Sequence, residues 1–201
     1  VKNYDFQTAL GQYGQIRRQY HLLRRLHLFL HEWGPQLAGM GVNLPDKRPS
    51  GKDDLSTLRW AVRSDGQSGF VFVNNYERSQ TLAAKHDVQF QLKLPGHELV
   101  FPADPVRIPP SARFLWPFNL DLGYGVRLAW ATAQPVTAID EGNTRTVFFA
   151  NSAEGIVYTN LFTGVHGNYL KSSIMRAGLD PENLPESDAS KMDFGSNRAP
   201  K

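Results

Sequence analysis

The stretch Thr57–Asn75, TLRWAVRSDGQSGFVFVNN, decides the fold class. Every second residue from Leu58 to Val62 is apolar, and alternation with a period of two is typical of a strand that buries one face. Ser64–Gly69 is rich in turn-forming residues, and Phe70–Asn74 then returns to a strand-like composition. The stretch therefore predicts a β-hairpin.

More short apolar runs, separated by Pro and Gly, follow this hairpin. They are Val88–Leu94, Leu99–Phe101, Val106–Ile108, Phe114–Phe118, Val126–Thr132 and Val147–Phe149. Short strands at this spacing favour an antiparallel β-sandwich. We expect residues 55–150 to form this sandwich, with residues 45–54 as a polar linker before it.

A long amphipathic helix is predicted before the linker, from Gln12 to Trp33. Its expected apolar stripe recurs at steps of three and four and comprises Tyr13, Ile16, Tyr20, Leu23, Leu26 or His27, Leu30 and Trp33. Gly34–Pro35 is expected to end the helix, since proline cannot supply the next amide hydrogen. We expect the helix to lie across the sandwich and to bury part of its stripe there. The chain is thus predicted to be mainly β, with one long helix before the sandwich and a short α/β appendage after it.

The composition is that of a soluble chain. Of 201 residues, 41% are hydrophobic and 20% are charged, and no apolar run reaches the roughly 18 residues that a membrane helix needs. The absence of cysteine excludes disulfides, thiolate metal sites and cysteine nucleophiles. Val1 opens the chain without an initiator Met or a signal-peptide pattern, so we expect it to start inside a longer protein.

The net charge of +3 arises largely from arginines on the predicted helix: Arg17, Arg18, Arg24 and Arg25. A solvated helix face explains them better than a nucleic-acid site, which would need base-reading partners. We expect neither nucleic acid nor membrane as a partner, and the sequence leaves compartment and oligomeric state open.

No complete catalytic or metal-binding set stands out. His27 and His31 have the spacing of a metal pair, but no acidic residue lies between them, so together with His21 we interpret them as core or interface histidines. A glycosidase needs two carboxyl groups across a cleft, whereas the neighbouring acids in Asp53–Asp54 and Asp140–Glu141 point to opposite sides of an extended chain. Turn formation accounts for both pairs.

Two other features allow more than one interpretation. Gly164–Asn168, before an expected helix at Tyr169–Ala177, could bind phosphate through backbone amides, or its glycines could serve the turn alone. Trp60, Trp116 and Trp130 could stack on sugars, although core packing is the default for aromatic residues that alternate with polar ones.

Tyr4 to about Ala150 resembles family 35 glycoside hydrolases, the β-galactosidases, in their bacterial form. The segments that carry the resemblance are YDFQTALGQYGQIRRQYHLLRRLHLFL, TLRWAVRSDGQSGFVFVNNYERS, DVQFQLKLPG and FLWPFNLDLGYGVRLAWATAQPV. The resemblance implies that residues 1–44 are the remnant of the last barrel strand and helix of a retaining enzyme, followed by an accessory β domain. It also implies that Tyr4 lines the galactose pocket, and that both catalytic glutamates lie on earlier strands, outside this chain.

Residues 152–197 are similar instead to the C-terminal part of nitronate monooxygenases, which use a flavin. GIVYTNLFTGVHGNYLKSSI and AGLDPENLPESDASKM carry this likeness. We expect a strand at Ile156–Thr159, a polar tail, and no flavin site, because the family's catalytic histidine and main phosphate loops have no counterpart here. Two unrelated excerpts in one frame predict a chimeric chain, with residues 151–201 as the second fragment.

Three functions follow as expectations. The first is a non-catalytic fragment of a β-galactosidase, inactive alone, with no cofactor and no metal. The second is a carbohydrate-binding β-sandwich module with a galactoside as its ligand. The third is a fragment of an FMN-dependent nitronate monooxygenase, which a yellow protein would reveal.

Overall fold

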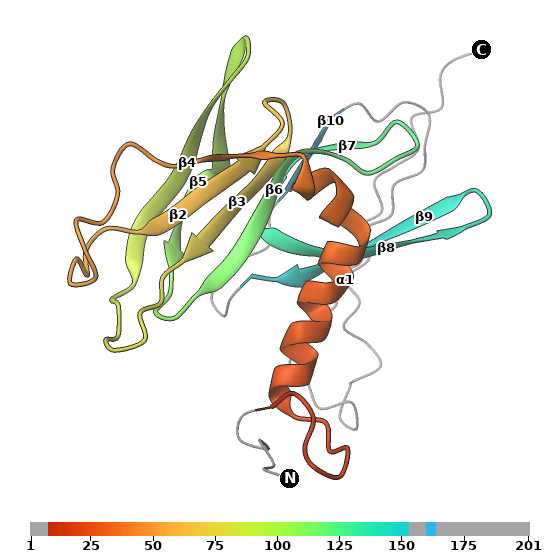
Figure 1. Cartoon of the computed structure of the whole chain (residues 1–201). Coiled ribbons are helices and arrows are strands. Elements are labelled where there is room, and N and C mark those ends of the chain that lie inside the picture. The colour runs from red at the N-terminus through yellow and green to blue at the C-terminus, as the bar shows by residue number, and fades with distance from the viewer. Residues whose placement is uncertain (1–7, 153–159, 164–201) are drawn as a thin grey trace, which may run out of the picture.

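The computed structural model describes residues 8–152 and the strand at residues 160–163 (Figure 1). Its elements are α1 (Arg18–Ala38), β1 (Gly41–Asn43), β2 (Arg59–Ser64), β3 (Gly69–Asn74), β4 (Lys85–Leu94), β5 (His97–Ile108), β6 (Arg113–Asp121), β7 (Arg127–Ala131), β8 (Ala133–Glu141), β9 (Thr144–Asn151) and β10 (Asn160–Thr163). The predicted fold class is confirmed: the chain is mainly β, with one helix followed by antiparallel sheets.

A six-stranded antiparallel sheet in the order β1-β2-β3-β6-β7-β10 forms the centre. The predicted hairpin is confirmed as β2 and β3, in which Trp60 lies opposite Val73. β10 pairs with β7 at the sheet edge and is the one described segment beyond Ser152. The boundaries predicted for the linker, the sandwich and the C-terminal fragment stay predictions.

One face of this sheet is covered by the hairpin of β4 and β5. Phe90 and Phe101 of that hairpin are buried against Trp116 of β6, with ring centroids 5.8 and 6.5 Å from the indole. Alternation in the strands places Val71 and Val73 of β3 on the same face. These side chains form the core of the sandwich.

The other face is covered by α1, together with the hairpin of β8 and β9, as Figure 1 shows. Phe29 of α1 meets Phe70 of β3 edge to face at 5.2 Å, and both are buried. Arg145 of β9 forms an ion pair with Glu32 of α1. The helix therefore lies across the sheet, as the sequence predicts.

The predicted bounds of the helix and its apolar stripe are wrong in three respects. α1 starts at Arg18, after a turn in which Gly14 has a φ of +80°, which favours glycine. It also runs through Pro35 to Ala38. The preceding residue is a glycine and has no Cβ to clash with the proline ring, and Leu37 packs on the sheet.

The third difference concerns the face that α1 buries. Its buried side chains are Phe29 and Trp33, whereas Leu23, Leu26 and Leu30 of the predicted stripe are exposed. Leu30 lies between Phe29 and Trp33 along the helix but about 100° round from Phe29, so α1 turns a different face to the sheet than the predicted stripe. Leu26 lies near the buried face but before Phe29, where the sheet no longer covers the helix.

Two strand predictions also differ from the structure. β5 is continuous across the two short runs expected at residues 99–101 and 106–108. β8 was not predicted, because Pro135 lies within it. The pairing of β8 with β9 shifts between Pro135 and Thr137, and an irregularity of this kind accommodates a residue that cannot donate to the ladder.

Candidate functional site

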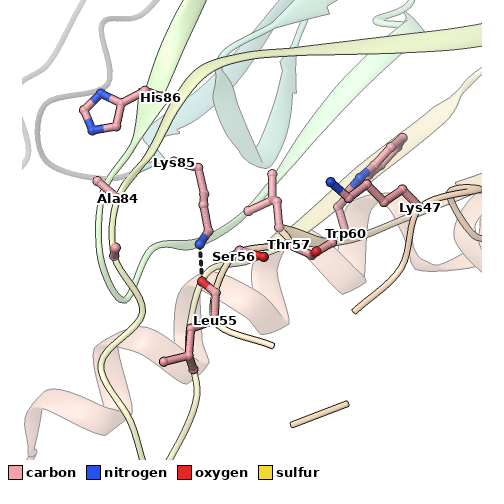
Figure 2. A pocket seen from close by; sticks show the side chains of 10 residues that line it. Lys47, Leu55, Ser56, Thr57, Trp60, Ala84, Lys85 and His86 are labelled. Atoms are coloured by element: carbon pink, nitrogen blue, oxygen red, sulfur yellow. Dashed lines mark hydrogen bonds between the residues drawn. The ribbon is translucent and has the colours of Figure 1, made fainter. Parts of the chain in front are cut away.

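A hollow of about 550 Å³ opens at the surface where the linker, β2 and the start of β4 meet (Figure 2). We call it the Trp60 hollow. It is lined by Lys47, Leu55, Ser56, Thr57, Leu58, Trp60, Ala83, Ala84, Lys85 and His86. The lining mixes apolar, hydroxyl and cationic side chains, and such a mixture is typical of sites for small polar ligands.

The linker wall of the hollow is fixed by Asp54. Its Oδ1 accepts hydrogen bonds from the amides of Ser56 and Thr57, both at 3.0 Å, and from the Ser56 hydroxyl at 2.8 Å. Its Oδ2 accepts from the amide of Ser50 at 3.2 Å. These bonds, with that from the Thr57 backbone the strongest, hold the pKa of Asp54 well below its usual range. The turn is therefore anchored by an ionised carboxylate.

The opposite wall is tied to the linker by Lys85, whose ammonium donates to the carbonyl of Leu55, drawn as a dashed line in Figure 2. Buried Asn75 supports the same wall by donating to the carbonyls of Ala83, at 3.0 Å, and Pro109, at 2.9 Å. Both walls are thus held by hydrogen bonds before any ligand arrives.

Trp60 forms part of the lining, and its ring packs on Phe90 with centroids 5.1 Å apart. The other tryptophans, Trp33, Trp116 and Trp130, are buried. The core interpretation is thus correct for Trp116 and Trp130, whereas half-buried Trp60 is the one tryptophan of the four that is not buried.

The positively charged side chains of the hollow are Lys47 and Lys85, and none of its lining residues is acidic. Nearby Asp53 accepts a hydrogen bond from Gln80 at 3.2 Å and is not part of the lining. Sequence reasoning missed these cations. Lys47 lies in a linker, and no local pattern shows that it meets the start of a strand almost 40 residues later.

One acid of each pair from the sequence analysis makes local hydrogen bonds. Asp54 caps its own turn, and Asp140 at the end of β8 accepts from Arg145 at 2.7 Å. Among the described residues, no group of three or more His, Asp or Glu side chains could hold a metal ion. Turn and hairpin roles account for both pairs.

His21, His27 and His31 are all exposed on α1, so the core alternative is wrong for them, and the interface alternative stays a prediction. The ring of His21 lies edge-on to that of Tyr20, with centroids 5.7 Å apart. A core role would need these positions on the side of the helix that faces the sheet, where Phe29 and Trp33 lie instead.

Several predicted features lie outside the described residues. They are Tyr4, the strand at Ile156–Thr159, the loop Gly164–Asn168 and the helix at Tyr169–Ala177. The galactose-pocket role of Tyr4 and the absence of a flavin site therefore stay predictions.

No protein-family model matches the chain, and no curated protein sequence matches it. The resemblances to family 35 glycoside hydrolases and to nitronate monooxygenases thus stay hypotheses.

Within the part of the chain that the structure describes, no helix combines the length and the apolar character that a membrane span requires.

Proposed function

We propose that the chain is a non-catalytic accessory β module of a β-galactosidase-type glycoside hydrolase, made to pack against another domain. The observation that carries this proposal is an apolar face of α1 that the other described elements leave exposed. Leu22, Leu23, Leu26 and Leu30 are each 41–49% exposed.

These leucines are not scattered over the helix. Leu22 stands seven residues before Phe29 and eleven before Trp33, and Leu26 stands three and seven residues before them. These spacings place all four side chains on one stripe. The sheet covers the C-terminal end of this stripe and leaves its N-terminal end open. Covering the exposed half of each leucine would contribute about 1 kcal/mol. An apolar stripe of this length supports a module that is stabilised by a neighbouring domain.

The charges around the stripe support a partner with acidic side chains. Arg18 and Arg25 lie near it on the helix, and the single acidic residue of α1, Glu32, is already paired with Arg145. A second copy of this chain would bring like charges together, which is unfavourable. We therefore infer that the partner is the catalytic domain of the parent hydrolase, with carboxylates at the rim of its contact surface.

Two measurements test this function. The chain alone should not hydrolyse a chromogenic β-galactoside, and turnover that a single Asp or Glu substitution abolishes would refute the non-catalytic role. The chain should also associate with the isolated barrel domain of a family 35 β-galactosidase in sedimentation experiments. The double variant Leu22→Ser/Leu26→Ser should weaken this association at least about tenfold.

The matched control is Val42→Ser, on β1, where the apolar side chain is 62% exposed but lies off the helix. It should bind the barrel domain like the unmodified chain. Equal affinity of the chain and the double leucine variant would show that the stripe is not the docking face.

A second candidate function is carbohydrate binding, and the observation that favours it is Trp60. The partly exposed edge of the Trp60 indole can contact the C–H face of a sugar ring. The Ser56 hydroxyl, which donates to Asp54, can still accept a hydrogen bond from a hydroxyl at the rim of that ring. Calorimetry with methyl β-galactoside tests this function, and Trp60→Ala should abolish the binding heat. Binding that survives this substitution would place the sugar elsewhere.

A further inference from the structure

We infer that the Trp60 hollow takes a saccharide unit that carries a carboxylate, a hexuronate, in preference to a neutral galactoside. This inference rests on the carbohydrate-binding function proposed for the same hollow and names the chemical class of its ligand.

The first support is the charge of the lining. Lys47 and Lys85 both line the hollow and come from segments on opposite walls. Neither forms an ion pair with a carboxylate of the described residues. Lys85 is half-buried and spends one ammonium hydrogen on the Leu55 carbonyl, so two of its three donors are left for a ligand. A neutral sugar would leave this positive charge uncompensated.

The second support is the rest of the surface of the hollow. Trp60, Leu58 and Ala84 offer an apolar surface to a sugar ring. Inorganic phosphate, or an anion bound to a metal ion, has no apolar face and would not use this surface. The ligand therefore needs a flat or gently puckered apolar face as well as a negative charge. A pyranose with a carboxylate at C6 has both.

The third support concerns the kind of anion. Phosphate sites in proteins commonly use successive backbone amides, and the amides of Ser56 and Thr57 are already bonded to Asp54. Recognition of charge in this hollow is thus left to lysine ammonium groups on opposite walls. A lysine ammonium is a compact point charge, so it can bind a single carboxylate without the two-pronged geometry that arginine imposes.

The experiment is a fluorescence titration of the full chain. Because Trp33, Trp116 and Trp130 are buried, a ligand in the hollow should change the emission of Trp60 selectively. The probes are D-galacturonate, D-galactose, D-galactose 6-sulfate and sodium acetate. We expect galacturonate to bind roughly tenfold more tightly than galactose at low salt, and this preference to shrink at 0.5 M salt, about where exposed ion pairs are screened.

Variants separate the contribution of charge from that of stacking. Lys47→Gln and Lys85→Gln should each reduce the preference for galacturonate and leave galactose affinity unchanged. Lys93→Gln, at an exposed position of β4 outside the hollow, is the matched control and should change neither affinity. Trp60→Phe should remove the fluorescence response, and calorimetry then follows binding to that variant. Lys47→Gln carries the test if Lys85→Gln fails to fold, because Lys47 is exposed.

The outcomes are distinct. Equal affinity for galacturonate and galactose would overturn this inference and leave carbohydrate binding standing, whereas no response to either sugar would overturn both. Acetate binding as tightly as galacturonate would show an adventitious anion only. Galactose 6-sulfate binding more tightly than galacturonate would overturn the assignment of a carboxylate.

Discussion

Trp116 donates its indole N–H to the hydroxyl of Ser152 at 2.5 Å, and the same hydroxyl donates to the carbonyl of Thr132 at 2.8 Å. All three residues are buried. The serine thus fastens the chain just after β9 to the core strand β6 and to the residue between β7 and β8. Without it, a buried indole N–H would have no acceptor.

Ser152→Ala should therefore destabilise the chain by about 1–3 kcal/mol, the cost of leaving a buried polar group unsatisfied. Urea unfolding, followed by circular dichroism, measures this difference. Ser79→Ala, at an exposed position, is the control and should change stability by less than about 0.5 kcal/mol. A loss of stability equal in the two variants would mean that the Trp116–Ser152 bond has no specific role.

The contact between α1 and β9 gives a second prediction. Arg145 pairs with both Glu32 of α1 and Asp140 of β8, and Glu32 is 24% exposed against 53% for Asp140. The more sheltered pair is screened less by solvent, so a double-mutant cycle of Glu32→Gln with Arg145→Gln should give a coupling free energy of about 1 kcal/mol.

The corresponding cycle of Asp140→Asn with Arg145→Gln is the internal comparison, and we expect a smaller coupling, about 0.3 kcal/mol. Thermal unfolding of each variant supplies the free energies. If the Asp140 cycle gave the larger value, Arg145 would act mainly within its own hairpin, not between the helix and the sheet.

The sequence predicts those parts of this fold in which a residue's contacts come from its neighbours in the chain. The hairpin of β2 and β3 follows from alternation between Leu58 and Val62 and from the apolar run Phe70–Val73, since each strand carries its own pattern and the turn between them is short. α1 is predicted in kind, but its buried face is not. Which residues of an apolar helix become buried is set by the length of the sheet beneath, and Leu26 lies beyond the region that the sheet covers.

The Trp60 hollow shows the same limit. The sequence offers Trp60 as one of three tryptophans that could stack on a sugar, but it does not show that Trp60, at the edge of the core, is the one that stays partly exposed. It does not reveal that Lys47 and Lys85 join it, since their proximity depends on the path of the linker and on the bond from Lys85 to Leu55. Pairing of distant segments of this kind leaves no periodic signal.

A third prediction concerns Asn75, whose buried amide group donates to the carbonyls of Ala83 and Pro109. Asn75→Ala should cost about 2–4 kcal/mol, because two carbonyls lose their donor and a small cavity is left. Since Ala83 lines the Trp60 hollow, the same change should also weaken sugar binding.

Urea unfolding and the fluorescence titration measure these two effects on the same variant. Asn74→Ala is the neighbouring control: its side chain is exposed at the end of β3, and both stability and sugar affinity should stay near the values of the unmodified chain. Full sugar affinity in a destabilised Asn75→Ala variant would show that this wall of the hollow does not depend on the amide.

The final prediction is a dependence of stability on pH that is centred on Asp54. Hydrogen bonds from the Thr57 amide first, and then from Ser56, lower the pKa of this carboxyl in the folded chain, whereas the unfolded chain titrates near the ordinary value of about 3.9. A carboxyl whose pKa is lowered by folding contributes stability that is fully present above the unfolded pKa and is lost as the pH falls towards the folded one. We therefore expect the urea midpoint to fall from about pH 5 downward.

Asp54→Asn removes this titration, so its urea midpoint should lie below that of the unmodified chain at pH 7 and approach it as the pH falls to about 2.5. Asp65, whose pKa is also lowered because the amides of Ser68 and Gln67 outweigh the effect of burial, keeps an acid transition in both chains. Because both chains keep the transition of Asp65, the difference between their curves of urea midpoint against pH reports Asp54 alone. Asp53→Asn is the matched control, because its carboxylate accepts from the Gln80 side chain and not from the turn. A difference from the unmodified chain that is constant from pH 7 to pH 2.5 would mean that the turn is not held by the charge on Asp54.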